Sequence, residues 1–243
     1  MKKIISITSV FIFLLTSIAF GYDDVSNSQY KEEIYFLTQY AILEGNDGSF
    51  RPQENLTRAE TARMLLRAYN KNDEMVKNSN ESNAGIKFSD IDEGHWAYHH
   101  IYRAATAQMI NGYSDGTVRP DENVTAVQFI TMAVRLVGYD ECAKEAGGYP
   151  EGYIKIAEEI GITQGMELEY DAYITREQAA KAVHSLINIP IRTVSGFEVV
   201  EKQNEDGTYT KEVVPSWIIA DGSDGNERLT LFNKIYDNNE LKE

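Results

Sequence analysis

Two fourteen-residue segments that begin 68 positions apart are nearly identical in sequence. DGSFRPQENLTRAE runs from Asp47 to Glu60, and DGTVRPDENVTAVQ runs from Asp115 to Gln128. Repetition at a fixed spacing is typical of chains built from small units that bury their apolar faces only by stacking on one another. We therefore expect an array of repeats rather than one irregular domain.

An amphipathic stretch precedes each copy and an apolar stretch follows it. The first stretches open with YDDVSNSQY (22–30) and FSDIDEGHW (88–96). Their apolar residues recur at helical spacing: Ile34, Leu37, Ala41 and Ile42 in the first copy, and Ile101, Ala104, Ala105 and Met109 in the second. We expect these helices to end at Gly45 and Gly112 as left-handed caps. Second helices are expected over 62–69 and 129–137.

A weaker third copy fits the same frame. YIKIAEEIGITQG (153–165) matches the first helix, and YITREQAAKAVHSLINI (173–189) matches the second, although the Asp-Gly turn and the proline are missing. The chain after Pro190 alternates apolar and polar residues around Asp206-Gly207, which predicts a β-hairpin. The predicted organisation is a signal peptide (1–21), repeat 1 (22–70), a polar linker (71–87), repeat 2 (88–140), repeat 3 (141–190), and a hairpin with an acidic tail (191–243).

Export is predicted by the first residues of the chain. Lys2 and Lys3 precede an apolar run, and small residues flank Phe20, as in a secretory signal peptide; the alternative is an uncleaved membrane anchor. The formal net charge of −15 disfavours nucleic acid and anionic membranes as partners. A single cysteine, Cys142, excludes an intramolecular disulfide.

The junction between loop and second helix carries the strongest functional signal. Thr57 with Glu60 forms a capping-box pattern, which helix geometry alone explains, and Thr125 and Thr175 repeat it with glutamine. Arg58 and Arg176 are not explained this way, because the positive end of the helix dipole disfavours a cation there. They indicate either an anion bound against the helix start or a surface arginine paired with a neighbouring acid.

In its repeated motifs, the chain over residues 22–190 resembles the S-layer homology (SLH) domain. The resemblance implies three repeats in a mainly α, pseudo-threefold bundle that binds secondary cell-wall polymers bearing pyruvate ketals on N-acetylmannosamine. It also implies that the motif arginine contacts the pyruvate carboxylate in a groove between repeats. Arg58 and Arg176 match the motif, whereas repeat 2 has Ala126 there, and Glu177 places an acid beside Arg176.

Two aromatic residues complete the candidate ligand-binding set. Trp96 and its counterpart Tyr30 open the first helices, and each either stacks on a sugar or packs in the core. The third counterpart is Tyr149 or Tyr153. With the motif glycines, the candidate set consists of Arg58, Arg176, Trp96, Tyr30, Gly45 and Gly112.

No catalytic motif, metal site or cofactor is expected. His95 and His99 have a metal-ligand spacing but lack a third ligand, and the Asp-Gly loops lack the acids of a calcium loop. The predicted function is non-enzymatic, non-covalent anchoring of an exported protein at the wall surface through an anionic polysaccharide. The alternatives are a structural S-layer or surface-assembly protein, itself contacting other surface proteins, and a truncated surface enzyme whose catalytic part is missing.

Overall fold

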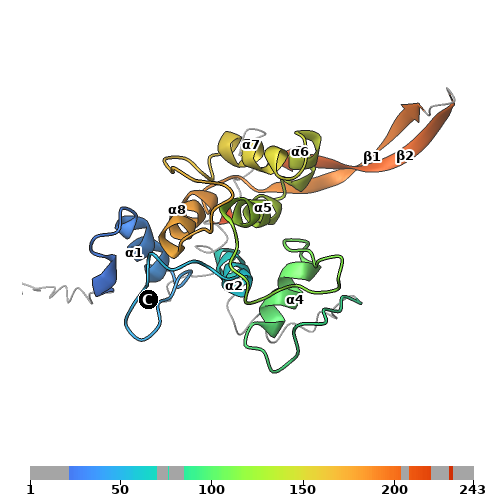
Figure 1. Ribbon diagram of the computed structural model, residues 1–243. Helices are drawn as coiled ribbons and strands as arrows, with labels where there is room; N and C mark the ends of the chain where they lie inside the picture. Colours follow the sequence, from blue (N-terminus) through green and yellow to red (C-terminus); the bar gives the residue numbers. More distant parts are fainter. Residues whose placement is uncertain (1–21, 70–75, 77–84, 204–207, 220–229, 232–243) are drawn as a thin grey trace, which may run out of the picture.

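The computed structural model describes residues 22–69, 76, 85–203, 208–219 and 230–231 and is mainly helical, as predicted (Figure 1). Its elements in chain order are η1 (Asp23–Val25), α1 (Lys31–Gln39), α2 (Arg58–Ala68), α4 (Tyr98–Thr106), α5 (Ala126–Leu136), α6 (Asp140–Glu145), α7 (Glu151–Glu159), α8 (Arg176–Leu186), β1 (Arg192–Gln203) and β2 (Tyr209–Ile219). The sequence patterns did not predict the short helix α6.

The helices pack in pairs that join different repeats. Helix α4 lies against α2, α7 lies against α5, and α1 lies against α8 (Figure 1). The first helix of each repeat thus covers the second helix of another repeat in cyclic order. The apolar core is consequently shared between repeats rather than divided among them.

Three loop segments, one from each repeat, are joined by a closed ring of backbone hydrogen bonds. The Leu56 amide donates to the Ile174 carbonyl at 3.2 Å, Val124 donates to Leu56 at 3.0 Å, and Ile174 donates to Val124 at 3.1 Å. The three side chains are almost completely buried. Such a ring needs all three segments, so it ties the helix starts of the three repeats to one another.

The helix starts combine the predicted capping boxes with contacts that the sequence did not predict. In α2, α5 and α8, the threonine and the Glu or Gln three residues later cap each other reciprocally. The Arg58 and Ala59 amides donate to the carbonyls of Glu122 and Pro120, both at 2.9 Å. The amides at the start of α2 are therefore not open to an anion, as one of the two interpretations of Arg58 and Arg176 required. The same holds for α8, whose Arg176 and Glu177 amides donate to the carbonyls of Glu54 and Pro52 at 2.9 and 3.0 Å.

The expected glycine caps are also wrong. Helices α1 and α4 end at Gln39 and Thr106, and the left-handed residues that follow are Ala41 and Gln108, both with a φ of 55°. The motif glycines have another physical reason. A Cβ atom on Gly45 would lie 2.5 Å from the Tyr22 ring, and one on Gly112 would lie 2.6 Å from the Phe88 ring.

In the C-terminal segment, β1 and β2 pair antiparallel and extend away from the helices (Figure 1). The Arg192 amide donates to the Val137 carbonyl at 2.9 Å, which joins the base of β1 to α5. The predicted signal peptide, most of the linker, the hairpin turn and most of the acidic tail lie outside the described residues. Within the linker, Val76 is described and is buried.

Candidate functional site

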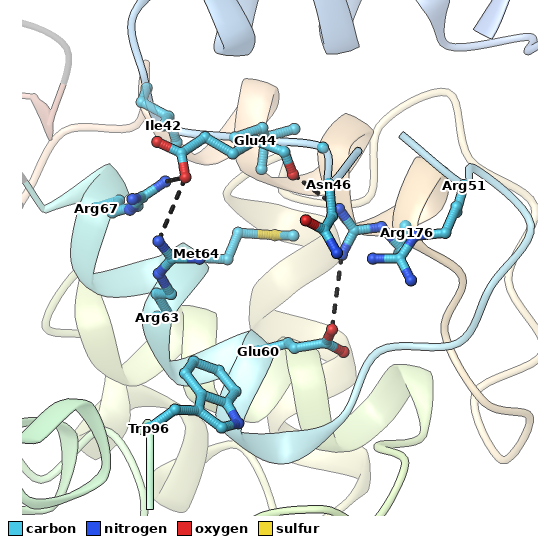
Figure 2. Close-up of a pocket in the computed structure, with 12 residues that line it drawn as sticks. Ile42, Glu44, Asn46, Arg51, Glu60, Arg63, Met64, Arg67, Trp96 and Arg176 are labelled. Atoms are coloured by element: carbon cyan, nitrogen blue, oxygen red, sulfur yellow. Dashed lines mark hydrogen bonds and ion pairs between the residues drawn. The ribbon is translucent and has the colours of Figure 1, made fainter. Parts of the chain in front are cut away.

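Arg176 reaches from α8 into a cavity of about 420 Å³ on the face of repeat 1 (Figure 2). We name this the Arg176 cavity. It is lined by the loop between α1 and α2, by one face of α2, and by Trp96 of repeat 2 and Arg176 of repeat 3. The full set is Ile42, Leu43, Glu44, Gly45, Asn46, Arg51, Glu60, Arg63, Met64, Arg67, Trp96 and Arg176. All three repeats therefore contribute to it.

The Arg176 guanidinium is held rigidly by backbone carbonyls of repeat 1. Its Nε donates to the Phe50 carbonyl at 2.8 Å, and its Nη2 donates to the Glu44 carbonyl at 3.0 Å. Its Nη1 lies 4.0 Å from a Glu60 carboxylate oxygen (Figure 2). Burial lowers the pKa of this guanidinium, and the Glu60 carboxylate opposes this shift. Because an arginine side chain stays protonated in proteins, the group is a fixed cation.

A second group of charges lies on the other side of the cavity (Figure 2). Glu44 Oε2 lies 3.3 Å from Arg63 Nη2 and 3.0 Å from Arg67 Nη1. Trp96 lies below this group in the view and is 50% exposed. Cations and an accessible aromatic face thus border the same space, which suits an acidic sugar.

Arg58 lies in a smaller cavity of about 280 Å³. This cavity corresponds to the Arg176 cavity, with the counterpart positions of the next repeat as its lining. We name it the Arg58 cavity. Its lining residues come mainly from repeat 2: Arg58, Ile110, Asn111, Tyr113, Gln128, Thr131, Met132, Arg135 and Tyr149. Arg58 Nη2 donates to the Asn111 carbonyl at 2.6 Å, and the guanidinium lies 5.4 Å from the centre of the Tyr113 ring. Burial lowers the pKa of Arg58 as well.

The predicted aromatic residues occupy different environments. Trp96 lines the Arg176 cavity, whereas Tyr30, only 8% exposed, packs in the core at the start of α1 and lines neither of these two cavities. Tyr149 is 56% exposed and lines the Arg58 cavity. Tyr153 is instead buried, and its hydroxyl donates to Asp140. Of the two alternatives for the third aromatic, the structure places Tyr149 in Trp96's position.

The two motif glycines also differ in position. Gly45 lines the Arg176 cavity, and its amide donates to the Tyr22 hydroxyl at 2.7 Å. Gly112 packs against Phe88 and is not among the residues that line the Arg58 cavity. Sequence reasoning missed Arg63, Arg67 and Arg135. A signal was present, because Arg67 and Arg135 lie 68 positions apart, the spacing of the repeat itself.

At the third inter-repeat position, side chains of repeat 3 contact side chains of repeat 1. Glu177, whose carboxylate was expected beside Arg176, instead accepts hydrogen bonds from Ser28 Oγ at 2.5 Å and Gln53 Nε2 at 2.7 Å. Lys181 pairs with Glu33 at 3.1 Å across the contact of α8 with α1. Glu177 therefore joins repeat 3 to repeat 1 by hydrogen bonds. Ala126, which stands where the other repeats have the motif arginine, is 2% exposed and provides no cation.

The described ranges contain neither a metal site nor a membrane-spanning helix. No cluster of three or more His, Cys, Asp or Glu side chains there is arranged to hold a metal ion. Among the helices in those ranges, none has the length and apolar character to cross a membrane.

Comparison with known proteins matches the S-layer homology domain at residues 21–62 and 87–125. The third repeat lies outside these matches and stays a prediction. A cell surface protein of Thermoanaerobacter kivui is 24% identical over 211 residues, covering 82% of this chain and 26% of the relative. A cellulosome-anchoring protein of Acetivibrio thermocellus is 32% identical over 90 residues, covering 37% of this chain and 19% of the relative. An endo-1,4-beta-xylanase A of Thermoanaerobacterium saccharolyticum is 34% identical over 106 residues, covering 43% and 8%.

Proposed function

Because this chain carries S-layer homology domains, which place it at the cell surface, we propose that it anchors an exported protein non-covalently to the cell wall. The proposed ligand is an acidic wall polysaccharide that binds in the Arg176 and Arg58 cavities. The observation that carries the proposal is their common construction. In each cavity a buried arginine from one repeat is fixed by a carbonyl of a second repeat, and an exposed aromatic from a third repeat lies at the border.

The chemistry of the cavities favours a carboxylate-bearing sugar. A guanidinium offers planar, paired donors that match a carboxylate, and burial strengthens the interaction by excluding water. Trp96 and Tyr149 offer flat apolar faces suited to a sugar ring. We propose pyruvylated N-acetylmannosamine as the sugar unit, with its pyruvate carboxylate against Arg176 or Arg58.

The relatives support an anchoring role for this chain more than a catalytic activity of its own. The chain spans about a quarter of the Thermoanaerobacter kivui protein and 8% of the xylanase. Relatives whose names describe a surface protein, an anchoring protein and an enzyme thus each match this chain over a small part of their own length. A shared part of that kind supports a common attachment role, and we propose no catalytic activity for it.

Wall binding can be tested with purified sacculi. The chain without residues 1–21 is incubated with sacculi before and after mild acid removal of pyruvate, and bound protein is separated by sedimentation. Binding should be lost after acid treatment and in the double variant Arg58→Ala, Arg176→Ala. Undiminished binding to pyruvate-free walls would exclude the proposed ligand, and absence of binding to untreated walls would exclude anchoring.

A further inference from the structure

The two cavities share a frame but differ in the number and placement of their charged side chains. At equivalent positions on the second helices, the Arg176 cavity has Glu60 and Arg63, whereas the Arg58 cavity has Gln128 and Thr131. The lining of the Arg176 cavity includes four arginines and two glutamates; that of the Arg58 cavity includes two arginines and no acidic residue. The formal net charge of the two linings is therefore the same, +2, but six charged side chains carry it in the Arg176 cavity and two in the Arg58 cavity. This difference in the placement of charge suggests unequal ligands.

The arginines of the Arg176 cavity form two groups on opposite sides of it (Figure 2). Arg176 and Arg51 lie on one side, next to Asn46. Arg63 and Arg67 lie on the other side, where both contact the Glu44 carboxylate. Glu44 shows by its own position that this second pair accepts a carboxylate.

The Arg58 cavity lacks a second cationic group of this kind. Thr131, at the position of Arg63, donates its hydroxyl to the Val127 carbonyl at 2.8 Å. Arg135, at the position of Arg67, donates from its Nε to Asp140 at 2.9 Å, outside the cavity lining. Its charge is therefore already compensated by an acid from α6.

The Arg58 cavity is also narrower for a structural reason. Tyr113 stands where the Arg176 cavity has Asn46, and the guanidinium groups of Arg58 and Arg119 lie 5.4 and 4.0 Å from the centre of its ring. Arg119 is itself held by Asp115 at 3.0 Å. The ring therefore fills space that remains open beside Arg176, which agrees with the two volumes, 280 and 420 Å³.

We propose that the Arg176 cavity binds an acidic saccharide segment through two carboxylates at once, whereas the Arg58 cavity binds one. The first carboxylate contacts Arg176 and Arg51, in competition with Glu54, which lies 3.2 Å from Arg51 Nη1, and the second contacts Arg63 and Arg67, in competition with Glu44. The proposal rests on the proposed function, since it takes the first carboxylate to be that of a pyruvate ketal.

Two probes of equal size separate the two cavities. The dianionic probe is pyruvylated N-acetylmannosamine linked to glucuronic acid, and the monoanionic probe replaces the glucuronic acid with glucose. Calorimetry is performed on Arg58→Ala, which keeps the Arg176 cavity, and on Arg176→Ala, which keeps the Arg58 cavity. The Arg58→Ala chain should prefer the dianionic probe about tenfold, the scale of one charge-assisted hydrogen bond. The Arg176→Ala chain should bind both probes equally.

Three further variants in the Arg58→Ala background locate the second carboxylate. Arg63→Thr, which copies the Arg58 cavity, should abolish the preference, and Glu44→Gln should increase it, because the internal competitor loses its charge. Lys155→Thr, which removes an exposed cation of α7, should leave it unchanged. Thermal unfolding of each variant verifies that it is folded.

The outcomes distinguish this inference from the proposed function. If Arg58→Ala binds both probes with equal affinity, the two-carboxylate proposal is wrong while wall anchoring stands. If the unsubstituted chain binds neither probe, the proposed ligand is wrong and this proposal falls with it. A preference that survives Arg63→Thr would likewise overturn the assignment to Arg63 and Arg67.

Discussion

At the level of single residues, the motif arginines join repeats as well as lining cavities. Arg176 donates to the carbonyls of Phe50 and Glu44, whereas Arg58 donates from its Nη2 to the Asn111 carbonyl. Arg176→Ala should therefore lower the free energy of unfolding by about 1–3 kcal/mol, because it leaves carbonyls of repeat 1 without their donor. Arg58→Ala should cost less. Urea unfolding measures both, and equal losses would show that the second hydrogen bond contributes nothing.

The motif glycines predict a second effect at this scale. A methyl group on Gly112 would lie 2.6 Å from the Phe88 ring, so Gly112→Ala should destabilise the fold by about 1–3 kcal/mol through overpacking. Gly94→Ala is a suitable control, since its new Cβ would meet only the end of the Asp92 side chain, at 3.0 Å. Thermal unfolding compares the two, and similar melting temperatures would contradict the close-approach explanation.

Sequence analysis identified those cavity-lining residues whose type is unfavourable at their position in a helix. Arg58 and Arg176 stood out because a cation in the first turn opposes the helix dipole. Arg63 and Arg67 did not stand out in the sequence, because arginines are common on exposed helix faces. Only the fold shows that these two line a cavity. Glu177 was misjudged for the same reason. Its neighbour in sequence is Arg176, but its partners Ser28 and Gln53 come from repeat 1.

At the level of elements, the contact of α1 with α8 contains a titratable group. The His184 ring packs edge-on against Phe36 at 5.1 Å, and burial lowers the pKa of His184 below its usual value of 6.5, against a smaller opposing effect of Glu33. A lowered histidine pKa means that the folded state binds the proton more weakly, so protonation favours the unfolded chain. Stability should therefore be unaffected by His184 above about pH 6.5 and should fall below it, through the folded pKa.

This prediction is checked by unfolding the chain in urea between pH 8 and pH 5. His184→Phe, which keeps a ring against Phe36, should remove part of the loss of stability below pH 6.5. An identical pH profile for the variant would show that His184 does not contribute. Glu33 and Lys181, which face His184 from α1 and α8, remain in both chains and serve as an internal reference.

The capping boxes predicted where the second helices start, whereas the ends of the first helices were misplaced. The apolar stretches expected as helices over 62–69 and 129–137 end within one residue of α2 and α5, but these helices begin earlier, at Arg58 and Ala126. The capping boxes at Thr57, Thr125 and Thr175 are local patterns, and each marks the start of a helix in the structure. The ends of α1 and α4 were misplaced because Ala41 and Gln108 adopt the left-handed conformation that glycine was expected to supply. Local hydrogen bonds accompany that conformation at both ends, from the Ile42 amide to the Leu37 carbonyl and from the Met109 amide to the Ala104 carbonyl, each at 2.9 Å.

At the level of the whole molecule, the sequence repeat predicted three helical units but not the way they close. The first helix of each unit packs against the second helix of another unit, and the hydrogen-bonded ring through Leu56, Val124 and Ile174 needs all three loops. The hydrogen bonds of this ring join residues at least 50 positions apart, which lies beyond the reach of any local pattern. The pseudo-threefold symmetry implied by the family resemblance remains a prediction, whereas the cyclic hydrogen bonding is observed.

This closure predicts that the repeats fold together or not at all. A chain of residues 22–140 would lose α8, which covers α1, and α7, which covers α5, and its ring would be open at Leu56. It should therefore lose most of its helical circular dichroism and its cooperative transition, because the remaining repeats expose apolar faces that only the third can cover. A chain of residues 22–191 keeps the ring and all the helix pairs, so it should unfold in a single calorimetric transition. Cooperative unfolding of the 22–140 chain with its helical signal intact would show that the repeats are independent domains and that the ring is not needed for folding.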